Sequence, residues 1–187
     1  GTAAGNYNLT SVGTTTAAIT ALGITGSFTA SDKVYDGGTN ATVLTRALTG
    51  VLAGDTGNVS LTGGTASFGN PNVGAGKTVT LTGASLTGTA AGNYNLTSVG
   101  TTTAAITALG ITGSFTATDK VYDGGTNATV LTRTLTGVLA GDTGTVSLTG
   151  GTASFGNPNV GAGKTVTLTG ATLTGTAAGN YNLTSVG

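Results

Sequence analysis

The sequence repeats itself with a period of 87 residues, and this limits the fold more than any other feature. Residues 1–13 (GTAAGNYNLTSVG) recur at 88–100 and again at 175–187. The chain is therefore a short lead followed by two full periods, 14–100 and 101–187. A period of this length is too long for a solenoid coil or a propeller blade. It has the size of one small domain, so we expect two similar domains in tandem.

The two periods are almost identical in sequence. They differ at four positions, and each difference exchanges one small side chain of turn or surface type for another: Ser31/Thr118, Ala47/Thr134, Asn58/Thr145 and Ser85/Thr172. We therefore expect the same fold twice.

Alternation of apolar and polar residues predicts β-strands throughout both periods. Residues 78–82 alternate strictly, with Val79 and Leu81 on one face. This period of two, rich in β-branched residues, is typical of half-buried antiparallel strands. Glycine-rich turn signals such as Gly63-Gly64 separate the segments and indicate about seven strands per period. The predicted fold class is all-β: two tandem small antiparallel β-sandwich or Greek-key (Ig-like) domains, end to end.

The period also predicts where each domain begins. The strand-like residues 94–99 and 102–107 follow one another closely and are expected to close one domain. The predicted segments are 1–20, the closing strands of a preceding repeat or a donated strand; 21–107, the first domain; and 108–187, the second domain, which lacks its final strand. An unpaired strand is expected at either end of the pair.

The residue types in this chain exclude most kinds of catalytic and metal chemistry. Cys, His, Met, Trp, Glu and Gln are absent, and only 6% of residues are charged. The usual zinc and thiol sites and the Ser-His-Asp triad are therefore ruled out. We expect no enzyme activity, no catalytic residue and no cofactor.

Charge and hydropathy also limit the partners. The six basic residues are spread along the chain, whereas nucleic-acid binding by counterion release needs them clustered. No apolar run approaches the roughly 20 residues that span a bilayer. We therefore expect no nucleic-acid partner and no membrane insertion of these residues.

The segment Asp32–Thr39 (DKVYDGGT) recurs unchanged as Asp119–Thr126 and holds half the charges of its period. Asp followed by two Gly favours a tight turn, and the Lys can pair with a nearby Asp. We interpret the motif as a structural part of the fold that needs no ligand. Its residues are Lys33, Tyr35, Asp36 and Gly37 in the first period, and Lys120, Tyr122, Asp123 and Gly124 in the second.

Further segments follow the motif in a fixed order: LTGVLAGD at 48–55, ASF at 66–68, NVGAGKTV at 72–79 and GNY at 92–94. Together with the VYDG core, this order resembles the YDG-type repeat domain of large bacterial surface adhesins, including filamentous-haemagglutinin-like exoproteins. The resemblance spans nearly the whole period, twice. It departs from the family where Tyr35 is followed by Asp-Gly-Gly in place of the commoner Asp-Gly-Thr.

The resemblance implies an all-β module, arrayed in tandem in an extended protein that is extracellular or attached to the bacterial cell surface. The function expected from it is that of a spacer or stalk repeat that extends a distal binding region. The alternative is a weak binding module for a host surface, a glycan or a biofilm matrix, which gains avidity from repeat number. The expected partners are the neighbouring repeats of the same chain and, in the alternative, that surface.

Calcium binding is the one metal hypothesis that the sequence leaves open. Ca²⁺ takes six to eight oxygen ligands, several of them carboxylates. Three Asp per period without a D-x-D-x-D spacing favour solvated turns over a calcium site. The weak candidates are Asp32, Asp36, Asp55, Asp119, Asp123 and Asp142.

Two modifications were also considered. An isopeptide crosslink from Lys77 to a nearby Asn, assisted by Asp55, would require a buried Lys, which is rare. N-x-[ST] sequons begin at Asn8, Asn40 and Asn58, and the first two recur in the later copies. Matches of this kind are expected by chance in a chain rich in Asn and Thr, so glycosylation stays a hypothesis.

Overall fold

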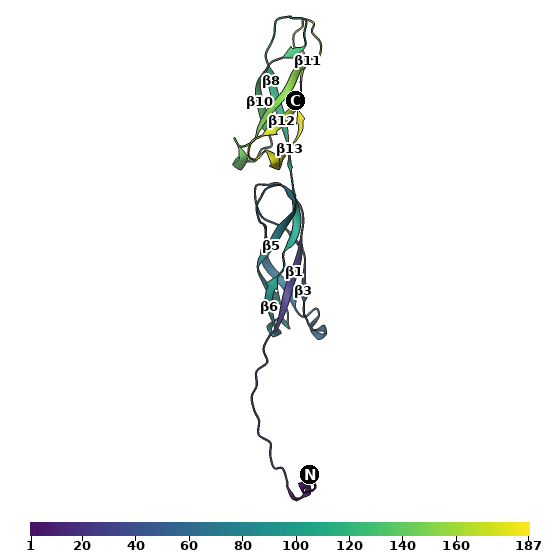
Figure 1. Ribbon diagram of the computed structural model, residues 1–187, viewed down its shortest axis with the longest axis vertical. Helices are drawn as coiled ribbons and strands as arrows, with labels where there is room; N and C mark the ends of the chain where they lie inside the picture. The colour runs from purple at the N-terminus through teal and green to yellow at the C-terminus, as the bar shows by residue number, and fades with distance from the viewer.

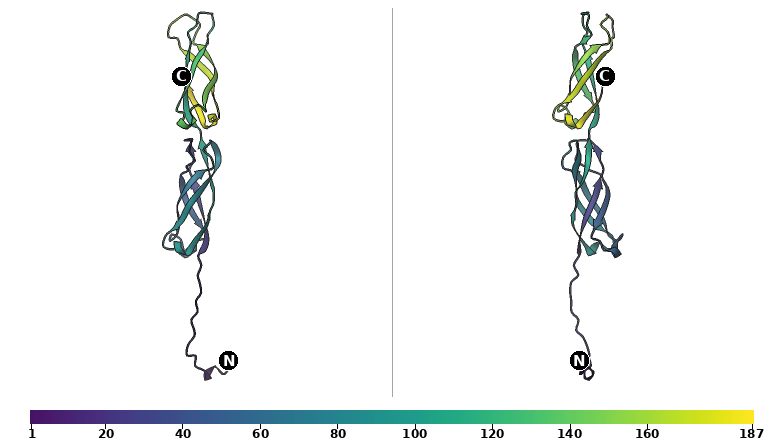
Figure 2. Two further views of the ribbon diagram at one scale, coloured as in Figure 1. Left: turned by 90° about the vertical axis from the view of Figure 1, so that its left-hand side faces the viewer. Right: turned by 45° about the vertical axis from the view of Figure 1, so that its right-hand side comes forward.

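The computed structural model describes residues 1–187, and its regular elements are strands joined by single 3-10 turns. The chain forms two slender β domains that lie end to end along one axis, with the N-terminal residues extending away from the lower domain (Figures 1 and 2). None of the helical turns has the length and hydropathy that a membrane-crossing helix needs.

The first repeat contains seven strands, as the alternation predicts. They are β1 (Leu22–Ala30), β2 (Lys33–Val34), β3 (Val43–Thr49), β4 (Ser60–Phe68), β5 (Gly74–Thr87), β6 (Tyr94–Val99) and β7 (Thr102–Thr107), with 3-10 turns at Ala53–Asp55 and Ala91–Asn93. They form a three-stranded sheet in the order β3-β1-β6 and a four-stranded sheet in the order β2-β7-β5-β4.

The second repeat contains six strands. They are β8 (Leu109–Ala117), β9 (Asn127–Ala128), β10 (Val130–Thr136), β11 (Ser147–Phe155), β12 (Val166–Thr174) and β13 (Tyr181–Val186), with 3-10 turns at Ala140–Asp142 and Ala178–Asn180. The sheets have the orders β10-β8-β13 and β12-β11-β9. This repeat has no counterpart of β7.

The alternating residues of both sheets point into a thin core between them. Phe28 from β1 meets Phe68 from β4 and Val79 from β5, and Ile106 of β7 completes the same cluster. Val79 and Ile106 are fully buried, with exposed fractions of 0% and 1%. Because polar Thr and Ser occupy the opposite faces of these strands, one face of each sheet is dry and the other is solvated.

These sandwiches confirm the prediction of an all-β chain with two tandem domains. Not every strand pair is antiparallel, however. β1 pairs with β6 in parallel, β8 pairs with β13 in parallel, and the short β2 pairs with β7 in parallel. The parallel pair β1-β6 arises because both strands begin at the same end of the domain, where Leu22 pairs with Tyr94, and run in the same direction.

The interpretation of Gly63-Gly64 as a turn is wrong. Both residues lie inside β4, which pairs without a register shift along β5. Their φ angles are +64° and +80°, which non-glycine residues rarely adopt. A Cβ on Gly64 would also lie 2.9 Å from the Thr82 carbonyl oxygen. The two glycines therefore distort a continuous strand and do not end it.

A single residue, Ala108, separates the two repeats. β7 pairs with β5 and β2 of the first repeat, and β8 begins the first strand of the second repeat directly afterwards. The chain therefore passes from one domain to the next as an almost continuous extended segment, visible along the axis in Figure 1.

Residues 1–20 pair with no strand of either repeat. A 3-10 turn at Ala4–Asn6 is their only regular element, and every residue of the segment is exposed. The strand that completes the first repeat is instead β7, whose sequence residues 14–20 share.

Candidate functional site

Tyr35 of the repeated motif lies at the joint between the repeats. It follows β2, where its backbone N–H donates to the Thr107 carbonyl oxygen at 2.8 Å. This pairing directs the side chain toward the second repeat, where its hydroxyl donates to Asp142 Oδ2 at 2.8 Å. The ring is 5% exposed. The motif of one repeat therefore binds its neighbour.

A second tyrosine converges on the same carboxylate oxygen. Tyr181, the first residue of β13, donates its hydroxyl to Asp142 Oδ2 at 2.7 Å. It also accepts the Leu139 backbone N–H at 3.1 Å. The Tyr35 and Tyr181 rings meet edge to face, with centroids 5.5 Å apart at 80°. This is a favourable geometry for an aromatic pair, so the joint combines apolar packing with two charge-assisted hydrogen bonds.

The surroundings of these tyrosines favour the protonated hydroxyl. Burial, followed by the hydrogen bond to Asp142, raises the pKa of Tyr181 to about 12. The same two causes raise the pKa of Tyr35 above its ordinary value of 10.0. Ionising either hydroxyl would remove a donor and place a second negative charge beside Asp142. The joint is therefore built for neutral tyrosines.

Asn180 supplies a second polar contact across the joint. Its Oδ1 accepts the Val73 backbone N–H at 3.0 Å, and its Nδ2 donates to Asn72 Oδ1 at 3.4 Å. Asn180 is buried here, whereas its counterpart Asn93 in the first repeat is exposed. The loop before β5 is thus attached to the 3-10 turn before β13.

The hydrophobic core is continuous through the joint. The larger buried cluster contains Phe28 and Ile106 of the first repeat together with Ile111 and Tyr181 of the second. The counterparts of its second-repeat members form a separate small cluster in the first repeat: Ile24, Val59, Ala90 and Tyr94. Ile111 and Tyr181 of the second repeat therefore belong to the core of the preceding repeat, whereas Ile24 and Tyr94 of the first repeat form a core of their own.

The Asp-Gly-Gly turn that follows Tyr35 is fixed by contacts of its own. Lys33 Nζ lies 2.6 Å from Asp36 Oδ1 and donates to the Gly38 carbonyl oxygen at 2.9 Å. Asp36 Oδ1 also accepts the Gly38 backbone N–H, and Gly37 takes a φ of +78°. The hydrogen bond from Lys33 lowers the pKa of Asp36 below its ordinary value. The Lys33 ammonium lies 5.9 Å from the centroid of the Phe68 ring.

The second copy of the motif has the same turn but no neighbour. Lys120 Nζ and Asp123 Oδ1 are 2.7 Å apart, and Gly124 has the same φ of +78°. Tyr122 is nevertheless 64% exposed, against 5% for Tyr35. The turn therefore forms without the joint. The tyrosine is buried in the repeat that has both β7 and a following repeat, and it is exposed in the repeat that has neither.

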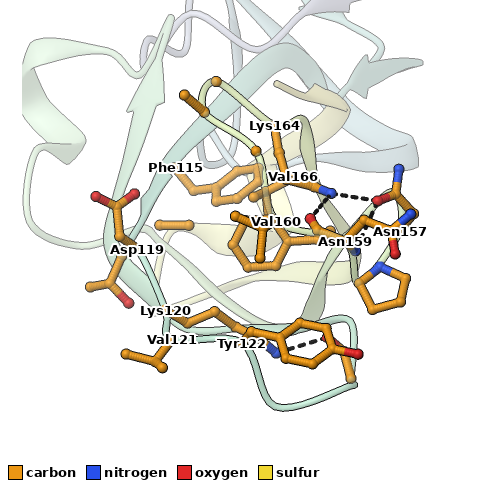
Figure 3. A pocket seen from close by; sticks show the side chains of 18 of the residues that line it. Phe115, Asp119, Lys120, Val121, Tyr122, Asn157, Asn159, Val160, Lys164 and Val166 are labelled. Atoms are coloured by element: carbon orange, nitrogen blue, oxygen red, sulfur yellow. Dashed lines mark hydrogen bonds between the residues drawn. The ribbon is translucent and has the colours of Figure 1, made fainter.

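The six aspartates considered for calcium lie at several separate places. Asp32 accepts the Ala105 backbone N–H at 2.6 Å, and Asp55 accepts the Tyr94 hydroxyl at 2.7 Å. Asp36 and Asp123 each pair with the Lys of their own turn, Asp142 holds the two tyrosines of the joint, and Asp119 lines a groove of the second repeat (Figure 3). No three acidic side chains gather into a group with metal-ligand spacing.

The residues considered for a crosslink are solvent-accessible. Lys77 Nζ donates to Asn70 Oδ1 at 2.7 Å in an exposed contact. Asp55, the proposed acid, binds Tyr94 in place of this pair. The structure does not assemble a buried Lys–Asn–Asp group.

One of the comparisons with known proteins identifies a family. A family model described as the YDG domain matches residues 21–104 and again residues 107–186. The two matches cover most of the chain. The chain belongs to the YDG domain family. Tyr35, Asp36 and Gly37 are the Tyr-Asp-Gly of the first YDG repeat, and Tyr122, Asp123 and Gly124 are those of the second. The comparisons with curated proteins and with solved structures each found no match.

Sequence reasoning placed the YDG motif in a turn but missed its part in the joint. It named Asp142 only as a weak calcium candidate, and it did not name Asn180 or Tyr181, which form the rest of the other half of the contact. One signal was present in the sequence: a Tyr beside a turn exposes its ring unless something covers it. The partner could not be named, because Asp142 lies 107 residues away.

Proposed function

We propose that each YDG repeat is a structural spacer in the stalk of a secreted or surface-attached bacterial adhesin, and that the YDG motif is its coupling element. The observation that carries this proposal is the joint around Asp142, which accepts hydrogen bonds from Tyr35 of one repeat and Tyr181 of the next. A stalk needs repeats held end to end, and this joint holds them so.

Two further features support a stalk. The linker between β7 and β8 is one residue long, which leaves little freedom for one repeat to swing about the next. The near-identity of the repeats also means that each joint in a longer array would contain the same residues. The length of the stalk then grows with the number of repeats, while a separate region at its far end binds the target.

Small-angle X-ray scattering of the two-repeat chain tests the proposal. We expect a rod profile with both domains on one axis, and a shorter, broader distribution of distances for Asp142→Ala, which removes the shared acceptor. The matched control is Asp55→Ala, which removes the counterpart carboxylate where no neighbour packs. A wild-type profile of two domains in many relative orientations would contradict a stalk role.

One observation favours a second function, weak multivalent adhesion. Leu44 on β3 and its counterpart Leu131 on β10 are 63% and 66% exposed. An exposed leucine thus recurs at every repeat on a surface with little charge, which offers a weak apolar contact that adds up along an array.

Multivalent display of the two-repeat chain on beads discriminates between these functions. If adhesion is the function, the beads bind host-cell, glycan or matrix surfaces, and the double substitution Leu44→Asp with Leu131→Asp removes the binding. A spacer shows no binding in either form.

A further inference from the structure

Tension along a stalk of these repeats enters and leaves each repeat through particular strands. In the first repeat the chain enters at Leu22, the first residue of β1, and leaves after Thr107, the last residue of β7. These two points lie at opposite ends of the domain (Figure 1). A pull along the axis therefore draws the start of β1 and the end of β7 apart.

β6 and β7 form one nearly continuous run from one end of the repeat to the other. Tyr94 of β6 pairs with Leu22 at the start of β1, and Thr107 of β7 pairs with Val34 just beyond the end of β1. Only residues 100–101 separate β6 from β7, where the run passes from the first sheet to the second. The run that carries the load out of the repeat therefore begins beside the strand through which the load enters.

The parallel pairing of β1 with β6 determines how this load is resisted. Because both strands run the same way, a pull on the start of β1 and on the end of the β6–β7 run slides one strand along the other. The evenly spaced hydrogen bonds of a parallel ladder then bear the load together. A pull that separated the two strands from one end would instead break these bonds one at a time. Sliding the strands therefore requires the larger force.

The ladder between β1 and β6 covers the part of β1 through which the load enters. It has five register pairs, from Leu22 opposite Tyr94 to Gly26 opposite Val99. It also continues beyond β6, where the Gly100 backbone N–H donates to the Gly26 carbonyl oxygen at 2.9 Å. The first residues of β1 are therefore held to the β6–β7 run along their whole length.

A side chain closes the one irregular point of this ladder. The register shifts between Ile24 and Thr25, so that Thr97 on β6 is opposite no residue of β1. The Thr97 hydroxyl donates to the Ile24 carbonyl oxygen at 2.9 Å. Ile24 itself is 2% exposed and packs with Val59 and Tyr94 in the smaller core cluster. Sliding β1 along β6 would break this hydrogen bond and draw Ile24 out of the core.

The same arrangement recurs in the second repeat. β8 pairs in parallel with β13, and the register shifts at the matching place. The Thr184 hydroxyl donates to the Ile111 carbonyl oxygen at 3.0 Å, and the Gly187 backbone N–H donates to the Gly113 carbonyl oxygen at 3.0 Å. The parallel ladder and the threonine that completes it therefore belong to the repeat unit.

We propose that the parallel pairs β1-β6 and β8-β13 are mechanical clamps, which keep each repeat folded when tension acts along the stalk. The proposal rests on the spacer function for the source of the tension. The clamp itself is a property of one repeat, because all of its contacts lie within that repeat. A stalk with such clamps transmits a pull along its length without unfolding.

Single-molecule force spectroscopy of the full chain in two pulling geometries tests the proposal. The chain has no cysteine, so handles attach only at an introduced pair. Ala21→Cys with Ala108→Cys loads the clamp of the first repeat along the axis. Ala21→Cys with Asn93→Cys pulls on the adjacent starts of β1 and β6 and peels them apart. We expect the rupture force to be at least about twofold higher along the axis, because forced unfolding reports the unfolding barrier and more bonds must break together there.

Removing one hydroxyl tests the clamp in the axial geometry alone. Thr97→Val keeps the shape of the side chain and removes the donor to the Ile24 carbonyl oxygen. Under constant axial force it should shorten the lifetime of the folded first repeat about fivefold, the effect of one ordinary hydrogen bond. The matched control is Thr29→Val, which removes a hydroxyl of β1 that lies 2.6 Å from the Thr45 hydroxyl on β3. Because β3 lies outside the load path, this variant should keep the wild-type lifetime.

Equal rupture forces in the two pulling geometries would overturn the proposal, as would an effect of Thr29→Val as large as that of Thr97→Val. These results are separate from the test of the spacer function, which is the scattering profile. A rod whose strands peel and slide at the same force would reject the clamp alone. A chain with freely orienting domains and a strong axial clamp would reject the spacer alone.

Discussion

The Tyr35 hydroxyl and Asp142 Oδ2, 107 residues apart in sequence, are joined by a hydrogen bond of 2.8 Å across the boundary between the repeats. The same oxygen accepts the Tyr181 hydroxyl at 2.7 Å. The Tyr35 side chain thus packs against the second repeat and donates a hydrogen bond to it. The YDG turn holds Tyr35 in that position.

Removing the Tyr35 hydroxyl should weaken the joint and leave both domains folded. We expect Tyr35→Phe to lower the free energy of unfolding by about 1.5 kcal/mol, the low end of the range for a hydrogen bond to a charged group. Urea unfolding followed by circular dichroism measures the loss. Tyr122→Phe is the matched control, and its effect should stay within about 0.5 kcal/mol because that ring is exposed. Equal effects of the two substitutions would argue against a special role for Tyr35.

Asp142→Ala should cost more than Asp55→Ala. The first substitution leaves two hydroxyls, those of Tyr35 and Tyr181, without their acceptor, whereas the second affects Tyr94 alone. We expect a difference of at least about 1 kcal/mol between the two variants in urea unfolding. If Asp55→Ala is the more damaging, the carboxylate contributes within each repeat only.

The joint should lose stability at alkaline pH. The folded pKa of Tyr181, about 12, lies above the ordinary value of 10.0, so the folded chain binds this proton more tightly than the unfolded chain. This contribution is fully present below pH 10 and disappears as pH rises toward 12.

Urea unfolding at several pH values between about 9 and 12 measures this loss. Tyr181→Phe should show a shallower decline than the wild type across the same window, and the comparison cancels the titration of lysines. Parallel declines in the two proteins would show that Tyr181 does not couple pH to stability.

Phe68→Ala and Phe155→Ala compare one core position with and without the covering strand. Phe68 is 3% exposed, so its truncation should cost roughly 3–5 kcal/mol. Phe155 lies half-buried beside the open groove, and the same change there should cost at least about 1 kcal/mol less. Thermal unfolding by calorimetry gives both values. A cost below about 1 kcal/mol at Phe68 would contradict its inward orientation.

The sequence predicts most of what lies within one repeat. The alternation around Val79 and Leu81 places both side chains in the core. The predicted number of about seven strands matches the first repeat, although the short β2 lies in the motif that was interpreted as a turn. The strand prediction fails where glycine is compatible with both a turn and a strand. Gly63-Gly64 looks like a turn, yet its positive φ angles are accommodated inside β4.

What lies between repeats could not be predicted, because the sequence is the same where the surroundings differ. Tyr35 and Tyr122 occupy identical segments, and one is buried while the other is exposed. Residues 14–20 and 101–107 likewise share every residue, and only the second segment contains a paired strand. In each pair, burial or strand pairing depends on which neighbouring segments are present. The local sequence is the same in both members of the pair, so it does not predict the difference.

The central claim is that the YDG motif fixes one repeat relative to the next. Residual dipolar couplings measured on both repeats of a weakly aligned, segmentally labelled sample test it most directly. We predict that the two repeats share one alignment tensor in the wild type and have separate tensors in Asp142→Ala. Separate tensors in the wild-type chain would contradict the claim.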